Sequence, residues 1–179
     1  MNNITAAAAA LVVGATTAIT AAVAASAATA QTTTPNVTGA NRPHADVHVI
    51  QYVDKVDDNS NTDIDLGAPG FSVGNQQLFR DRLLRNGRQI GTSAGVAQIV
   101  ALTATTLTAQ VVATATLPAG QLTYQFAFTE ILADGPPKVL HTAITGGTGS
   151  YRNARGECQA RFIANTDDTN VRCTVIVED

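Results

Sequence analysis

Eight runs of alternating or β-branched residues, separated by short turn sequences, follow one another after residue 45 of this 179-residue chain. A period of two is typical of a β-strand with one buried face. In the clearest run, one face carries Leu122, Tyr124, Phe126, Phe128 and Glu130. The predicted strands are Asp46–Asp54, Phe71–Arg80, Arg88–Leu102, Thr106–Leu117, Gln121–Glu130, Val139–Thr145, Glu157–Ala164 and Val171–Glu178.

The connections between these runs are those of an antiparallel all-β fold. Asn86-Gly87 predicts a two-residue hairpin turn, and Pro118-Ala119-Gly120 marks another turn. No segment has a convincing helical period. An even number of antiparallel strands closes on itself without an exposed edge, so we predict an eight-stranded antiparallel β-barrel. A two-sheet sandwich is the alternative, because periodicity does not separate the two. A barrel of this size holds side chains or one small ligand.

The N-terminal segment is predicted to be a secretory signal. Residues 5–30 are nearly all small or apolar, and Ala28-Thr29-Ala30 forms an A-x-A cleavage pattern before Gln31. The first residues hold no Lys or Arg, and a run of this length also fits a membrane anchor. We interpret residues 1–30 as the signal peptide, 31–45 as a flexible lead-in and 46–179 as the barrel domain of a secreted protein.

The charge balance is weak. Charged residues make up 14% of the chain and the formal net charge is −3, which gives no electrostatic basis for binding nucleic acid. The sequence contains no glycine-rich phosphate loop, dinucleotide-binding motif or Cys/His cluster of the kind that binds zinc. We therefore expect neither a cofactor nor a metal.

Two cysteines, Cys158 and Cys173, flank the turn-rich residues 165–170. If the neighbouring runs form a symmetric hairpin, the two side chains lie opposite each other and are close enough for a disulfide. Two buried free thiols are the alternative. Export to an oxidising compartment favours the disulfide.

The glycine-rich stretch Gly146–Gly156, GGTGSYRNARG, reads as a shaped connection between two strands because glycine tolerates positive φ. It resembles the signature G-G-T-G-x-F/Y-x-x-A-x-G of plant dirigent proteins and allene oxide cyclases. Arg88–Gly95, RQIGTSAG, and Ala143–Gly149, AITGGTG, resemble the cyclase patterns at the same relative places. The resemblance spans about Asp46 to Glu178.

This resemblance implies a calycin-type antiparallel barrel with an interior pocket that guides cyclisation or coupling of a small organic molecule. It also implies a homo-oligomer, a trimer or a dimer, since plant members are trimers. Gln51 stands where allene oxide cyclases carry a glutamate, and an amide cannot act as a carboxylate base. Asp54 matches an aspartate of pinoresinol-forming dirigent proteins, whereas Leu140 replaces their arginine.

Three residues are candidate catalytic groups. Asp54 is a candidate acid or base at a barrel mouth, or else an ordinary carboxylate at the end of a strand. Glu130 would have a raised pKa if its face points inward, and would have no role if it points outward. His141 is a candidate that titrates near neutral pH, although a histidine on a strand is more often structural.

The candidate ligand-binding residues are Tyr124, Phe126, Phe128, Tyr151, Arg152 and Arg155. The tyrosines would offer hydroxyls or pack the barrel, and the arginines would bind an anionic ligand or hold the glycine loop by backbone hydrogen bonds. The favoured function is a secreted, cofactor-free barrel that binds a small hydrophobic metabolite and promotes its cyclisation, isomerisation or stereoselective coupling. The alternative is a non-catalytic binding or structural module.

Overall fold

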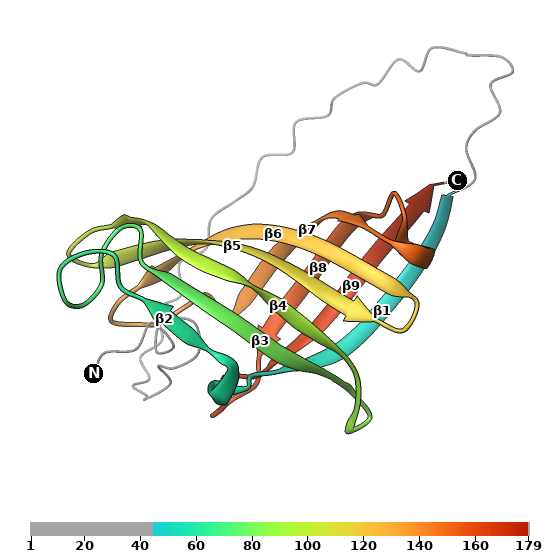
Figure 1. The fold of residues 1–179 in the computed structure, drawn as a ribbon, viewed down its shortest axis with the longest axis horizontal. Coiled ribbons are helices and arrows are strands. Elements are labelled where there is room, and N and C mark those ends of the chain that lie inside the picture. Colours follow the sequence, from blue (N-terminus) through green and yellow to red (C-terminus); the bar gives the residue numbers. More distant parts are fainter. Residues whose placement is uncertain (1–44, 179) are drawn as a thin grey trace, which may run out of the picture.

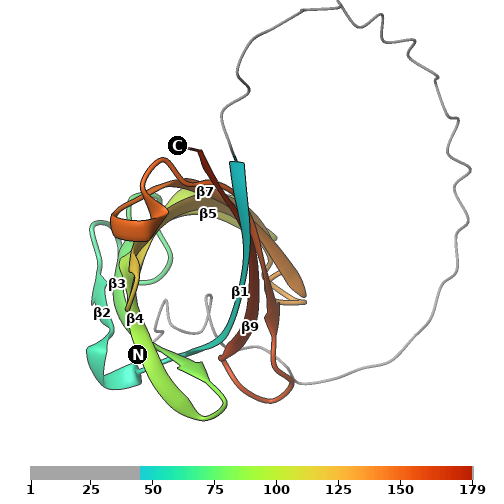
Figure 2. The ribbon, with the colours of Figure 1, turned by 90° about the vertical axis from the view of Figure 1, so that its right-hand side faces the viewer.

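The computed structural model describes residues 45–178, which form one antiparallel sheet that curls into a closed ring (Figures 1 and 2). The strand order is β1-β9-β8-β7-β6-β5-β4-β3-β2, and β1 also pairs with β3. Closure rests on three pairs, of which Asp54 opposite Leu83 is the central one. The strands are β1 Ala45–Lys55, β2 Thr62–Ile64, β3 Gln76–Arg85, β4 Arg88–Leu102, β5 Thr106–Leu117, β6 Gly120–Ile131, β7 Val139–Gly147, β8 Arg155–Phe162 and β9 Thr169–Glu178.

The predicted eight-stranded antiparallel barrel is therefore confirmed, and the sandwich is excluded because one sheet closes on itself. The short strand β2 is additional: it lies outside the ring on β3, within a region expected to be a loop (Figure 2). Two 3-10 turns, η1 at Asp58–Ser60 and η2 at Gly149–Tyr151, complete the described elements. Among residues 45–178, no helix has the length and apolar character needed to cross a membrane. The predicted signal peptide and nearly all of the lead-in lie outside the described residues.

One strand boundary was predicted wrongly. The run expected at 71–80 begins only at Gln76 and continues to Arg85. Gly74 has φ of +99°, and the side chain of Asn75 accepts from the N–H of Leu66 and donates to the carbonyl of Gly70. These bonds hold the preceding segment in a loop, and the charged residues from position 80 onward belong to the strand.

The barrel interior is packed at the end where β1 begins. Side chains from most strands meet there, and Leu83, Leu122 and Val175 are at most 1% exposed. Each fully buried side chain of this kind stabilises the fold by about 1.5–3 kcal/mol. A second, smaller cluster of Ile99, Leu107 and Ala109 lies on the wall formed by the long strands β4 and β5. The space between the two clusters is lined by inward-facing residues such as Val111 and Phe126.

The glycine motif lies at the packed end of the barrel. Arg155, at its end, is in register with Ile176, which in turn pairs with Val47 near the start of β1. A Cβ atom on Gly149 would lie 2.5 Å from the carbonyl oxygen of Ala119 in the β5–β6 turn. The packed core therefore closes this end of the barrel, and the motif packs against the β5–β6 turn through backbone contacts that only glycine permits.

Candidate functional site

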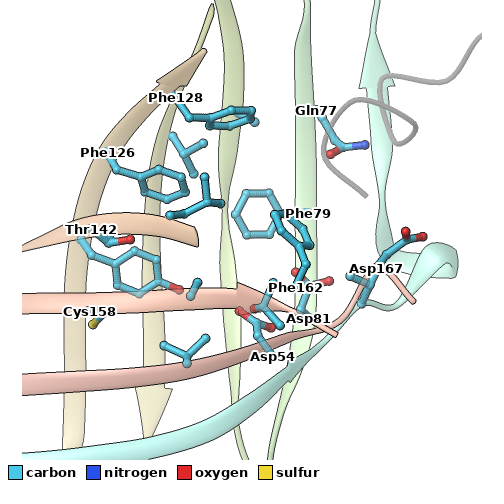
Figure 3. Close-up of a pocket in the computed structure, with 18 of the residues that line it drawn as sticks. Asp54, Gln77, Phe79, Asp81, Phe126, Phe128, Thr142, Cys158, Phe162 and Asp167 are labelled. Carbon is cyan, nitrogen blue, oxygen red and sulfur yellow. The ribbon is translucent and has the colours of Figure 1, made fainter. Parts of the chain in front are cut away.

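A cavity of about 150 Å³ opens into the barrel at the end opposite the glycine motif, where β1 ends and β9 begins (Figure 3). Its lining comes from the inward-facing rows of the barrel strands and from the loop after β1. The row Tyr124, Phe126 and Phe128 of β6 lies in this wall. Of the two orientations that the sequence left open for this face, the structure shows the inward one.

One side of the cavity is aromatic. The rings of Phe126 and Phe128 stack with centroids 6.2 Å apart. Phe79 of β3 and Phe162 of β8 add two further rings, which lie between β6 and the carboxylate side of the cavity in Figure 3. The ring of Phe79 fits because its partner on β4 is Gly95, where a Cβ would lie 2.8 Å from the ring.

The other side of the cavity carries carboxyl groups. Asp54 at the end of β1 and Asp81 of β3 lie near each other across from Phe126 and Phe128, and Asp167 lies at the mouth (Figure 3). Asp81 is 9% exposed and accepts a hydrogen bond from the backbone N–H of Asp57 at 3.2 Å. Asp168, beside the cavity, accepts from Lys55 Nζ at 2.8 Å.

Asp54 is the carboxyl group with the most perturbed environment. Its Oδ1 atom is buried and has no hydrogen-bond partner among the described residues. Burial, with the nearby charges of Asp81 and then Asp168, raises the pKa of Asp54 from 3.8 to about 8. Asp54 is therefore largely protonated at neutral pH and can both donate and accept a proton near it.

Two tyrosines adjoin this carboxyl group. Tyr124 shares a hydrogen bond with Ser93 of β4, which is fully buried. Burial, followed by the charge of Asp54, raises the pKa of Tyr124 well above its ordinary value. Burial likewise raises the pKa of Tyr52, which lies two residues before Asp54 on the same face. Both phenols therefore stay protonated over the physiological pH range.

Glu130 is a separate buried carboxyl group. It is 4% exposed and follows Phe128 along the inward row of β6, but it does not line the cavity. Its Oε2 atom has no hydrogen-bond partner among residues 45–178. Burial raises the pKa of Glu130 to about 7. Glu130 therefore has the inward orientation, which was one of the two alternatives for this residue.

The other sequence candidates lie elsewhere. His141 is exposed on the outer face of β7, while its neighbours Leu140 and Thr142 line the cavity. Tyr151 packs against the core at the sealed end. Arg152 and Arg155 are exposed at that same end.

The two arginines therefore do not meet the cavity. Arg155 Nη1 donates to the carbonyl of Ala154 at 2.8 Å, which is the loop-holding contact considered as the alternative role. Gln51, the amide at the cyclase glutamate position, lies on the outer face of β1. The structure thus brings together Asp54, Tyr124, Phe126 and Phe128, and leaves His141, Tyr151, Arg152 and Arg155 outside.

Cys158 and Cys173 lie directly opposite each other on β8 and β9 and form a disulfide with an S–S distance of 2.05 Å. The predicted pairing is confirmed. Cys158 also lines the cavity, so its sulfur there is a disulfide sulfur and offers no thiol nucleophile.

Four residues that line the cavity were not among the predicted candidates: Asn61, Phe79, Asp81 and Phe162. A signal for Asp81 was present in the sequence, because alternate residues of a strand share a face and Asp81 lies between Phe79 and Leu83 on the inward face of β3. Its flanking arginines made the segment look solvent-exposed. Asn61 lies in the loop after β1, where no period indicates which side chains face inward.

The arrangement supports proton transfer to or from a small molecule held against the aromatic wall. Among residues 45–178, no group of three or more His, Cys, Asp or Glu side chains is placed to hold a metal ion. Acid–base chemistry by Asp54, aided by neutral phenols, is what the side chains of the cavity can perform.

Comparisons with known proteins agree with this architecture. The solved structure of a pyocyanin demethylase is similar over 72% of this chain and 98% of its own, with 27% sequence identity and a TM-score of 0.58. A pterocarpan synthase dirigent protein matches over 83% of this chain and 99% of its own, with 19% identity and a TM-score of 0.60. An exo-specific intermolecular Diels–Alderase matches over 76% of this chain and 100% of its own, with 15% identity and a TM-score of 0.54.

No curated protein matches the sequence. Residues 51–176 match the family described as the allene oxide cyclase barrel like domain. This match includes the second half of β1, nearly all of β9 and the whole of every other strand of the closed ring, with the aromatic row of β6 and the glycine motif. The chain therefore belongs to the family of allene oxide cyclase barrel-like domains.

Proposed function

We propose that this barrel binds a small hydrophobic molecule in its cavity and promotes its cyclisation, isomerisation or stereoselective coupling, with Asp54 as the acid–base group. The observation that carries the proposal is the Asp54 carboxyl group, which faces an aromatic cavity with a buried, unpartnered oxygen and a pKa of about 8. A group with a pKa near the working pH exchanges protons most effectively. The dirigent and Diels–Alderase neighbours support the reaction class.

The remaining residues have distinct roles in this proposal. Phe126 and Phe128 hold the apolar body of the ligand in one orientation, which lowers the barrier by selecting a reactive conformer. Tyr124 donates a hydrogen bond as a neutral phenol, and Ser93 fixes the position of its hydroxyl group. Because shape and orientation provide much of the rate in such reactions, no strong nucleophile is needed.

A generic carbon acid tests whether Asp54 works as a base. We would use 5-nitro-1,2-benzisoxazole, whose C3 proton is removed by a carboxylate while the N–O bond breaks, giving a coloured cyanophenolate. The expected rate rises with pH towards a plateau above about 8, because the ionised carboxylate is the active form. Asp54→Asn removes this pH-dependent rate, whereas Glu157→Gln, which changes an exposed carboxyl group on β8, leaves it unchanged.

Binding must be measured in the same samples, by quenching of tyrosine fluorescence or by NMR. If the benzisoxazole binds but is not turned over, the non-catalytic binding module is the better description. If neither this probe nor the smaller neutral ring of benzyl alcohol binds, the ligand cavity itself is refuted. Circular dichroism of each variant establishes that the fold is intact.

Native mass spectrometry of the protein from its own host would identify the natural ligand.

We also propose that the chain is exported and cleaved after Ala30. The disulfide supports this proposal because such bonds persist in oxidising compartments. A mature chain that begins at Gln31 in the culture medium is the expected result, and an unprocessed N-terminus would contradict it.

A further inference from the structure

The ionisable side chains that line the cavity are all acidic or phenolic. Asp54, Asp81 and Asp167 contribute carboxyl groups, and no Lys, Arg or His is among the described lining residues. The nearby ammonium group of Lys55 lies outside the lining and is bound by Asp168 at 2.8 Å. The electrostatic potential in the cavity therefore favours a positively charged guest over an anion.

Two buried oxygen atoms in the cavity also lack hydrogen-bond donors. Asp54 Oδ1 and Asn61 Oδ1 are both buried and unpartnered among residues 45–178. A buried acceptor without a donor is unfavourable, and a ligand that supplies N–H groups would remove this penalty. This observation is independent of the acidic lining and points to the same kind of guest.

The aromatic wall is suited to the same chemistry. The faces of Phe126 and Phe128 attract cations as well as apolar groups. A cavity of about 150 Å³ has room for about one aromatic ring. The carboxyl groups are not gathered closely enough to form a metal site within residues 45–178, which favours an extended organic cation.

We propose that the cavity selects an aromatic organic cation, namely a ring that carries a protonated amine whose N–H groups are bound by Asp54 and Asn61. This inference rests on the proposed function, because it specifies the class of small molecule that the barrel binds. The ring packs against Phe126 and Phe128, and the ammonium group faces the carboxyl side.

Binding of such a cation is coupled to a proton. Asp54 is largely protonated in the empty cavity at neutral pH, and an ammonium group beside it favours the ionised form. The charged and titratable groups that face or adjoin Asp54 are Asp81 on β3, Asp167 and Asp168 before β9, Lys55 and Tyr52 on β1 and Tyr124 on β6. Both phenols stay protonated, so the cation's affinity should rise with pH until Asp54 is ionised.

The test compares two probes of equal size by NMR titration or calorimetry. Benzylammonium carries the charge and the N–H donors, and benzyl alcohol is its neutral counterpart. At pH 8 we expect benzylammonium to bind about tenfold to a hundredfold more tightly than benzyl alcohol, because this is the typical gain from a buried hydrogen bond to a charged group. Its affinity should fall by up to about tenfold per pH unit below pH 8, while that of benzyl alcohol stays nearly constant.

Variants assign the effect to the cavity. Asp54→Asn should abolish the pH dependence and most of the preference for the cation, because Asp81, Asp167 and the aromatic wall remain. Glu157→Gln should preserve both. Asn61→Asp adds a carboxylate at an isosteric position and should increase the preference. Equal binding of both probes by the wild type, or an undiminished and pH-dependent preference in Asp54→Asn, overturns the inference.

The two proposals fail in different ways. If benzyl alcohol and benzisoxazole bind while benzylammonium has no advantage, the cavity binds neutral molecules and only the cation inference is lost. If none of the three probes binds, the proposed function fails as well.

Discussion

Replacing Asp54 by Asn should stabilise the protein in a pH-dependent way. The carboxyl group ionises near pH 3.8 in the unfolded chain but only near pH 8 in the folded barrel. Between these values the folded state retains a proton that the unfolded state has released, so the stability of the wild type falls as pH rises. Each pH unit in this window costs about 1.4 kcal/mol.

The variant lacks this cost, because Asn is neutral at every pH and nearly isosteric with the protonated acid. The difference in free energy of unfolding, Asp54→Asn minus wild type, should therefore be small at pH 4 and rise towards about 5 kcal/mol at pH 8 as an upper limit. Water at the cavity mouth lowers this value. Chemical denaturation of both proteins at half-unit steps of pH measures it.

Taking the difference between the two proteins cancels the titrations that are not coupled to Asp54, such as that of Glu130, whose pKa is raised by burial alone. A difference that does not change between pH 4 and 8 would refute the reasoning, since it would mean that Asp54 ionises equally easily in both states. A difference that falls with pH would show that a cationic group stabilises the Asp54 carboxylate.

Three further predictions concern the scaffold. Reducing the Cys158–Cys173 disulfide, which joins residues 15 positions apart, should lower the free energy of unfolding by about 3 kcal/mol. Thermal unfolding with and without reductant measures this loss. An unchanged midpoint temperature would mean that the bond does not stabilise the fold. Gly156→Ala should be far more destabilising than Gly70→Ala. Both positions have positive φ, but only at Gly156 would the new methyl group lie 2.0 Å from a backbone oxygen. Equal losses of stability in denaturant titrations of the two variants would argue against this clash. Leu83→Ala, at a fully buried position, should cost about 2–5 kcal/mol, and a loss below 1 kcal/mol would mean that the packed end is looser than described.

The ring of strands was predictable because its signals are local. Period-two runs and turn residues gave seven of the eight barrel strands nearly at their observed positions, and the Leu122–Glu130 row already showed which residues share a face. The boundary of β3 was not predictable in the same way. It depends on Asn75, whose side chain bonds to two backbone groups that lie apart in the sequence.

The candidate site was predicted only in part, for a physical reason. The alternation of residues along a strand shows which side chains share a face but not which face points into the barrel. Both faces of β3 and of β7 carry a mixture of polar and apolar residues, so hydrophobicity does not decide it either. Asp81 was therefore missed between two outward-facing arginines, while the exposed His141 looked as suitable as its neighbours. The position of a side chain along the barrel axis is equally hidden, which is why Arg152 and Arg155 were grouped with residues at the opposite end.

The sealed end has a consequence for the kinetics. Because the packed core fills one end of the barrel, the cavity described among residues 45–178 opens at the other end. If the proposed reaction takes place in this cavity, its substrate and its product occupy the same space, so product inhibition should be competitive. The cavity has room for only about one aromatic ring, so it cannot enclose two aromatic partners. A coupling of two molecules would therefore join a bound partner to one that arrives at the entrance. A cyclisation or an isomerisation of one molecule would proceed wholly inside.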